Sequence, residues 1–510
     1  MRGRLSQRLH SLAATEASEQ PQDVFRVQSS ESSDSDGMDA AISSKAHRFL
    51  LWKFVLLAVL CYIDRTSLAF AAIELQADLH FSSAIYGLGA SLFFIGYIVW
   101  QVPSNLIIVR LGPRIWLGSL AVCWGVIAAL FATIKTAAAF YALRIALGFA
   151  EAGTMPGMWY ACSVFYQPDD LTSAWSLVLV GISASQIVGA PIASLLLKLD
   201  GLLDVRGWQW IFIAEGFFTA VFGIFCLLSL PDGPETAAFL TPAERDRVAE
   251  RSARHKQQNA AGGTTLWQQI MKAVGDYRTW HLTLVLGIGN IPKYAILYWC
   301  PLIVNGLLGG RDTHKPEAQG EDKPDSSLVV LLSGLPFALS AALVALNAHH
   351  SRHTGERRWH CAIPLAFAAC AMLGLALALA SGHIVLALLC LLFSTAVWAP
   401  DSILASWPAT YLTGTAAATG AATINSVASL GGLAGPMLTG FLEQRGSLSI
   451  AVFVLSGATF LDALLAALFP SSSGDRPAHH AKEEQVRYAF LGEGARTTSD
   501  LEPAVRSEEA

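Results

Sequence analysis

Residues 49–71 read FLLWKFVLLAVLCYIDRTSLAFA, and this apolar run decides the fold. At ~1.5 Å of rise per residue, a helix of this length crosses a hydrocarbon core of ~30 Å. The run nevertheless carries Asp64 and Arg65. An ionisable group at the bilayer centre costs about 2.5–3.5 kcal/mol on insertion scales, so charges there indicate a buried polar site rather than a lipid-facing surface.

Eleven further apolar runs of similar length follow, and the chain as a whole is 53% hydrophobic and only 14% charged. Lipid offers no partner for open backbone groups, so these runs must be helices. A soluble protein of buried helices would need amphipathic surface helices, which the pattern does not offer. We therefore predict an all-α membrane protein with twelve transmembrane helices, at residues 49–71, 84–109, 114–134, 137–166, 171–198, 208–230, 281–305, 327–347, 359–380, 382–404, 412–440 and 449–470.

Polar segments divide these helices into two sets of six, the pattern of a transporter built from two repeats. Within the long polar segment, Thr241, Pro242 and Glu244 have the pattern of a helix start, with Thr as N-cap and Glu at N3. The predicted divisions are a disordered tail (1–48), a first six-helix bundle (49–230), a central loop (231–280), a second bundle (281–470) with a polar insertion (309–326), and a second tail (471–510).

The distribution of Lys and Arg predicts the orientation. With both termini cytoplasmic, the inner loops between helices carry twelve basic residues and the outer loops carry seven. The positive-inside rule therefore favours cytoplasmic termini. We expect a multi-pass protein of the plasma membrane, with an organelle membrane kept as an alternative because the first fifteen residues are basic and contain no acid.

The predicted fourth helix carries a second pair of charges, Arg144 and Glu151. Seven residues make two helical turns, so both side chains share one face and can line one cavity. Arg stays charged at any working pH, whereas a desolvated carboxylate can take up a proton. The planar guanidinium also binds both oxygens of a carboxylate at once. The pair therefore offers a fixed cation and a switchable anion on one wall.

Seven segments, found in the same order between residues 49 and 470, together resemble the anion:cation symporter family of the major facilitator superfamily. The resemblance is closer to the permeases for allantoate, tartrate, phthalate and sugar acids than to the vesicular glutamate branch. The segments are CYIDRTSLAF (61–70), GYIVWQVPSNLIIVRLGPRIWL (96–117), LRIALGFAEAGTMPGMWY (143–160), GWQWIFIAEG (207–216), LPDGPETAAFLTPAER (230–245), TGERRWH (354–360) and YLTGTAAATGAATINSVASLGGLAGP (411–436).

This resemblance implies a two-bundle transporter that carries small organic anions, commonly with protons, by alternating access. By the same likeness, Arg65 and Arg144 are assigned to anion binding or gating, and Asp64 and Glu151 to proton coupling. The structural alternative is that each neighbouring pair, Asp64 with Arg65 or Arg144 with Glu151, is an ion pair that holds helices together. Adjacent residues point ~100° apart on a helix, so Asp64 and Arg65 cannot serve only each other.

Other polar residues in the predicted helices are weaker candidates for the cavity. Packing between helices or a position at the membrane interface explains each of them equally well. The additional substrate-binding candidates are Asn425, Tyr62, Gln186 and Tyr298. Arg110 and Arg114, beside the turn Gly112–Pro113, are candidate gate residues by likeness to the superfamily, and topology anchors otherwise.

The function we predict is symport of a small organic anion with H⁺, by a monomer in the lipid bilayer. A facilitator or anion exchanger on the same fold, and a non-transporting membrane sensor, are the alternatives. An enzyme is not indicated, since the chain shows no paired nucleophile and base. We expect no cofactor, no metal and no nucleic-acid partner: the eight cysteines include no CxxC pair, and no GxxxxGK[ST] motif for ATP is present.

Overall fold

The computed structural model describes residues 37–261, 266–309, 324–412 and 414–469. In these ranges the chain is helical throughout and contains no strand. Ten helical stretches are long and apolar enough to cross a membrane, counting only the described residues. The other two predicted spans, 137–166 and 412–440, are present as the pair α6 and α7 and as α17. The prediction of an all-α membrane fold is confirmed.

The helices follow one another with short connections. In the first half they are α3 (Trp52–Leu79), α4 (Ser83–Leu111), α5 (Pro113–Leu130), α6 (Ala137–Glu151), α7 (Thr154–Phe165), α8 (Pro168–Leu197) and α9 (Gly207–Ser229). The polar central segment contains α10 (Pro242–Ala261) and α11 (Leu266–Gly275). The second half contains α12 (Tyr277–Leu308), α13 (Ser326–Thr354), α14 (Arg358–Ser381), α15 (Ile384–Ser394), α16 (Asp401–Ser406), α17 (Gly414–Gln444) and α18 (Leu448–Ala467). Short 3-10 or π-helical pieces lie at His47–Leu51, Phe131–Thr133, Leu202–Asp204, Pro234–Thr236, Thr395–Trp398 and Trp407–Thr410.

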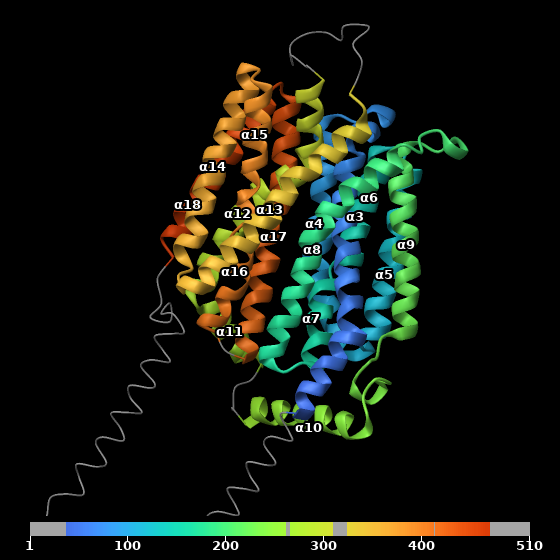
Figure 1. Ribbon diagram of the computed structural model, residues 1–510, viewed down its shortest axis with the longest axis vertical. Coiled ribbons are helices and arrows are strands. Elements are labelled where there is room, and N and C mark those ends of the chain that lie inside the picture. The colour runs from blue at the N-terminus through green and yellow to red at the C-terminus, as the bar shows by residue number, and fades with distance from the viewer. Residues whose placement is uncertain (1–36, 262–265, 310–323, 413, 470–510) are drawn as a thin grey trace, which may run out of the picture.

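The two halves stand side by side (Figure 1), α3 to α9 on one side and α12 to α18 on the other. Within the halves, α5 packs on α9 and α14 packs on α18. Between the halves, α4 packs on α17, α8 on α13, and α3 on α12. The charged side chains of α3 and α6 belong to helices near this interface between the halves. The functional site is therefore expected at the interface.

The segment before α3 differs from the prediction. The predicted disordered tail, 1–48, includes residues 37–46, which are helical and continue through a π-helical turn into α3. Its Lys45 ammonium donates to both carboxylate oxygens of Glu244 at 2.8 Å. Asp39 accepts a hydrogen bond from Arg247 at 2.9 Å. The rest of this tail, most of the predicted insertion and the second tail lie outside the described residues.

The helix start predicted in the central segment is present. α10 begins at Pro242, the Thr241 N–H donates to Glu244 Oε2 at 2.8 Å, and the Glu244 N–H donates to Thr241 Oγ1 at 3.4 Å. This reciprocal arrangement is a capping box, which satisfies two backbone donors that a helix start leaves open. α10 lies across the end of the first half (Figure 1) and is tied to the chain start by Lys45.

Two of the transmembrane crossings are interrupted. The fourth breaks between α6 and α7 at Ala152 and Gly153, directly after Glu151. The crossing that begins with α15 passes through the 3-10 turn Thr395–Trp398 and Pro400 before α16 begins at Asp401. Broken helices at membrane depth are tolerated where they are buried in protein or line a cavity. Each break thus places a carboxylate beside non-helical backbone: Glu151 at the first break and Asp401 at the second.

Candidate functional site

The centre of the site is a buried ion pair between two helices of the first half. Arg65 of α3 donates from Nε to Glu151 Oε2 of α6 at 2.8 Å. The side chains are only 3% and 0% exposed. The Cys61 thiol, one turn before Arg65, lies 3.2 Å from the same oxygen. Glu151 therefore pairs with Arg65 of a different helix, and neither of the neighbouring pairs considered from the sequence forms.

Aromatic rings surround the Arg65 guanidinium. Its centre lies 4.9 Å from the ring centroids of Tyr62 and Tyr97 and 5.0 Å from that of Phe93. A guanidinium over a ring face is attracted by the ring quadrupole, and the attraction grows when water is excluded. Tyr62 was a candidate from the sequence and lies here; Phe93 and Tyr97 were not singled out.

Arg144 also contacts the Phe93 ring, with its guanidinium carbon 5.0 Å from the ring centroid. Its Nε donates to the Gly89 carbonyl and its Nη2 to the Ala90 carbonyl, both at 3.1 Å. Nη2 also donates to the Tyr298 hydroxyl at 3.0 Å. Tyr298 belongs to α12, so this bond joins the two halves of the molecule. Arg144 is 1% exposed.

The hydrogen bonds of Arg144 to α4 are possible because α4 and α6 pack closely at glycine residues. A Cβ on Gly148 of α6 would lie 2.0 Å from the Phe93 carbonyl oxygen of α4, and one on Gly96 would lie 2.2 Å from the Ile145 carbonyl oxygen. No side chain fits at such distances, so α4 and α6 touch backbone to backbone. This contact brings the Gly89 and Ala90 carbonyls within reach of Arg144.

Asp64, the residue before Arg65 in α3, is buried beside this pair at 3% exposure. Asp64 Oδ2 and Glu151 Oε1 have no donor among the described residues. Two carboxylate oxygens are both acceptors, so a hydrogen bond between them requires a proton on one. Two ionised carboxyls this close in an apolar interior repel each other strongly. A proton on either carboxyl would relieve this repulsion.

Three buried charged residues, Glu215, Lys293 and Asp462, and the partly exposed Asp401 were not singled out from the sequence. Glu215 of α9 accepts a short hydrogen bond from the Ser67 hydroxyl of α3, and its Oε2 is unpartnered among the described residues. In the second half, Lys293 of α12 donates to Asp401 of α16, and Asp462 of α18 is 1% exposed. The signal that would have found them is the one that found Asp64, namely a charged residue within an apolar run.

The remaining candidates lie away from the ion pair. Asn425 is exposed on α17, and its neighbour Ser426 donates to Gln101 of α4 at 2.5 Å. Gln186 is half-buried on α8. Their assignment to substrate binding stays a prediction. The structure brings together Asp64, Arg65, Arg144, Glu151, Tyr62 and Tyr298.

The predicted gate residues lie at the turn between α4 and α5. Gly112 has φ 84°, a backbone conformation that favours glycine. Arg114 donates to Asp232, the second residue after α9's C-cap, at 2.9 Å. Arg110 is exposed. Arg114 thus pairs within the first half, and a latch to the second half stays a prediction.

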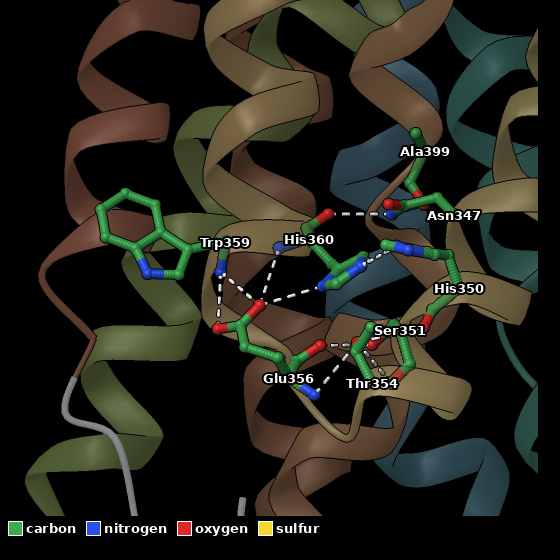
Figure 2. A network of polar contacts seen from close by, with 8 residues as sticks. All are labelled: Asn347, His350, Ser351, Thr354, Glu356, Trp359, His360 and Ala399. Atoms are coloured by element: carbon green, nitrogen blue, oxygen red, sulfur yellow. Dashed lines mark hydrogen bonds and ion pairs between the residues drawn. The ribbon is translucent and has the colours of Figure 1, made fainter.

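Histidines at the turn between α13 and α14 form a polar chain (Figure 2). His350 Nδ1 lies 2.6 Å from His360 Nε2, and His360 Nδ1 lies 2.9 Å from Glu356 Oε2. Asn347 donates from Nδ2 to the carbonyls of His360 at 2.8 Å and Ala399 at 3.0 Å. Through Asn347, this turn is tied to the break that precedes Asp401.

Comparison with known proteins agrees with this architecture. The chain is 32% identical over 425 residues to a putative tartrate transporter of Agrobacterium vitis, covering 82% of this chain and 89% of that protein. It is 30% identical over 451 residues to a putative metabolite transport protein of Pseudomonas putida, covering 87% and 98%. These relatives are transporters and not enzymes.

Solved structures show the same fold. A D-xylose–proton symporter matches with a TM-score of 0.62 at 15% identity, over 83% of this chain and 99% of that one. An inward-facing bacterial homologue of the human lysosomal transporter Spinster matches with a TM-score of 0.61 at 16% identity, over 83% and 96%. The sequence profile of the Major Facilitator Superfamily matches residues 54–436. With its apolar helices, its two halves and these relatives, the chain belongs to the Major Facilitator Superfamily of membrane transporters.

Proposed function

We propose that this transporter moves a small organic anion together with a proton by alternating access. The observation that carries the proposal is the buried pair of Arg65 and Glu151, with Asp64 beside it. Breaking a buried ion pair by removing one partner costs about 3–5 kcal/mol, because it leaves an uncompensated charge. A substrate that supplies the missing charge removes that cost.

A carboxylate and a proton can replace each other in this site. When Glu151 takes up a proton it loses its charge, and Arg65 becomes free to bind the carboxylate of a substrate. When the substrate leaves, Glu151 releases its proton and pairs with Arg65 again. The number of charges inside the apolar core is the same with substrate bound and without it. Neither state therefore buries an unpaired charge.

Arg144 links this exchange to the second half of the molecule. It holds Tyr298 of α12 through the hydroxyl, while its backbone bonds to α4 fix its position. A substrate carboxylate that binds Arg144 competes with Tyr298 for the same Nη2 donors. We infer that loss of the Tyr298 contact is one step in the relative movement of the halves.

The substrate class we propose is a small carboxylate, with tartrate as the first compound to test. The relatives named as tartrate transporters support this choice. Two guanidiniums that both contact the Phe93 ring suit carboxylate oxygens, since the guanidinium fork binds a carboxylate through two donors.

The test is uptake of radiolabelled tartrate and a panel of other organic anions into liposomes, with and without an inward proton gradient. We compare the wild type with Glu151→Gln and Arg144→Ala, and use Asp204→Asn in an exposed loop as the matched control. Gradient-driven uptake that both site variants lose, and the control keeps, supports proton symport.

Other outcomes contradict the proposal in separate ways. Uptake of an anion that does not respond to the gradient indicates a facilitator or an exchanger on the same fold. Anion binding without any flux indicates a sensor. Gradient-driven uptake that survives in Glu151→Gln assigns the coupling to a residue other than Glu151.

A further inference from the structure

A second set of buried charges lies in the half that the proposed anion site does not occupy. Lys293 of α12 has a side chain only 5% exposed, and its ammonium is hydrogen-bonded to Asp401 Oδ1 of α16. Asp462 of α18 is buried at 1% exposure. Three different helices therefore contribute one buried cation, the buried carboxyl of Asp462 and the partly exposed carboxyl of Asp401.

Asp462 lies close enough for Lys293 to reach it. A Cβ on Gly289 would lie 2.5 Å from Asp462 Oδ2, so the carboxyl rests directly against the backbone of α12. Gly289 precedes Lys293 by four residues, which is about one helical turn, or ~5.4 Å along the axis and on the same face. A lysine side chain can span such a distance by changing its rotamers.

One oxygen of Asp462 has no partner. Oδ1 is buried and accepts no hydrogen bond among the described residues. A bare carboxylate in this position would be far more costly than a protonated one. The charged and titratable groups that act on it come from the surrounding helices, namely Lys293 of α12, Asp401 of α16 and the buried thiol of Cys361 of α14. With one cation for two carboxyls, charge balance requires one proton.

Asp401 lies at the surface of the packed core. Its side chain is 41% exposed although that of its partner Lys293 is buried. It begins the short helix α16, directly after the break at Pro400. Asn347 donates a hydrogen bond to the Ala399 carbonyl and so fixes the backbone at that break (Figure 2). Asp401 is therefore the accessible carboxyl of the cluster, whereas Asp462 is enclosed in the packed core.

We propose that Lys293, Asp401 and Asp462 form a second proton-binding site, in which two carboxyls share one proton and Lys293 pairs with whichever carboxyl is ionised. In the structure Lys293 pairs with Asp401, and the proton belongs on Asp462. When Asp401 takes up a proton from water, Lys293 moves to Asp462, which gives up its proton as it becomes the partner. Lys293 stays charged throughout, and the cluster exchanges one proton without changing its net charge.

Infrared difference spectroscopy tests this without any substrate. The wild-type protein in lipid is compared between H2O and D2O buffer, and the C=O stretch of protonated carboxyls, which shifts when the exchanging proton is replaced by deuterium, is followed. In Asp462→Asn, Lys293 stays with an ionised Asp401; in Asp401→Asn it pairs with an ionised Asp462. We expect each single variant to lose one and the same exchanging carboxyl signal, and the double variant to lose no more than either.

Two further variants keep the test decisive. Asp462→Glu retains a carboxyl and should keep an exchanging signal at a shifted frequency, which separates a lost site from a misfolded protein. Asp204→Asn in an exposed loop should leave the wild-type signal unchanged. If both Asn variants keep every wild-type carboxyl signal, or if only one of them loses a signal, the cluster is a static ion pair and the proposal is wrong.

A transport measurement then tests whether this proton-binding site takes part in the transport cycle. Only this measurement rests on the proposed function. In liposomes loaded with a pH indicator, the number of protons moved per tartrate should fall by one in both Asn variants. If tartrate is not transported at all, the proposed substrate fails while the infrared result still stands. If the variants lose the infrared signal but keep the wild-type proton count, the site binds a proton that transport does not use, and its coupling role is wrong.

Discussion

At the proposed site, the hydroxyl of Tyr298 forms a single hydrogen bond that joins the two halves of the molecule. It accepts a hydrogen bond from Arg144 Nη2 at 3.0 Å, and the Tyr86 hydroxyl donates to the Tyr298 carbonyl at 2.9 Å. Tyr298 is completely buried. Its ring therefore has a fixed place, and only the hydroxyl is available to exchange partners.

Tyr298→Phe should keep the packing and remove this one contact. A hydrogen bond to a charged group is worth about 1.5–3 kcal/mol, so anion uptake should change by about 10- to 100-fold. If the substrate replaces the hydroxyl at Arg144, KM falls; if the hydroxyl itself holds the substrate, KM rises. Tyr277→Phe, on an exposed tyrosine of the same helix, is the control, and unchanged kinetics in Tyr298→Phe would exclude both roles.

Reading single residues located half of the buried charges. Asp64, Arg65, Arg144 and Glu151 were found because charged side chains stand out in apolar runs. Lys293 and Asp462 carry the same signal and were overlooked, since no neighbouring charge drew attention to them. Which charges pair could not be predicted: Arg65 and Glu151 are 86 positions apart, and only the packing of α3 on the fourth crossing makes them partners.

At the scale of the helices, the approach of α4 to α6 depends on glycine. Gly148→Ala would place a methyl group 2.0 Å from the Phe93 carbonyl oxygen, so the helices must move apart. We expect a loss of about 1–3 kcal/mol in stability and a larger loss of uptake, because Arg144 would be drawn away from Gly89 and Ala90. Thermal unfolding in detergent and liposome uptake measure the two effects.

The matched control for this variant is Gly457→Ala in α18. Nothing lies within 4 Å of a Cβ at that position. Replacing an unhindered helical glycine by alanine should stabilise the protein by about 0.5–1 kcal/mol. Equal melting temperatures for the two variants would show that the contact at Gly148 is not as tight as the structure describes.

The start of α10 gives a pH prediction outside the membrane helices. Burial opposes the charged form of Glu244, but hydrogen bonds from Lys45 and from the Thr241 N–H outweigh it and lower the pKa of Glu244. A carboxyl whose pKa is lower in the folded state contributes stability above its unfolded pKa of ~4.3, and this contribution is lost as the pH falls through the folded pKa. α10 should therefore detach in acid below about pH 4.

Hydrogen exchange of the α10 amides measures that detachment. Glu244→Gln keeps the side-chain length and removes the charge, so its α10 should exchange faster at neutral pH, with little further change in acid. Glu235→Gln, in the 3-10 turn upstream, is the control because Glu235 is exposed. An acid response that Glu244→Gln retains would assign it to a different group.

At the scale of the whole molecule, close contacts between the halves lie at the end opposite to α10. α3 begins at the α10 end, so the start of α4 and the end of α8 lie at the opposite end. There a Cβ on Gly87 of α4 would lie 3.0 Å from Gly440 of α17, and one on Gly334 of α13 would lie 2.9 Å from the Ala190 Cβ of α8. Alternating access requires this end to open in part of the cycle.

A disulfide between positions 190 and 334 should stop that opening. The paired Cβ atoms lie somewhat closer than the ~3.8 Å of an ordinary disulfide, so Ala190→Cys with Gly334→Cys can bond after a small relaxation. We expect at least a tenfold loss of uptake in the oxidised double variant and recovery with a reductant. Each single variant under oxidant is the control, and full uptake by the crosslinked protein would contradict alternating access at this end.

The sequence by itself determined the membrane class, the number of crossings, the division by a polar central segment and the start of α10. These properties depend on the length of apolar runs and on local hydrogen bonds, which neighbouring residues specify. Only the tertiary structure decided that Arg65 pairs with Glu151, that Arg144 reaches Tyr298, and that Lys293 pairs with Asp401. Such partners lie far apart in the chain, and what brings them together is the close packing of helices at small residues, which a hydropathy pattern does not record.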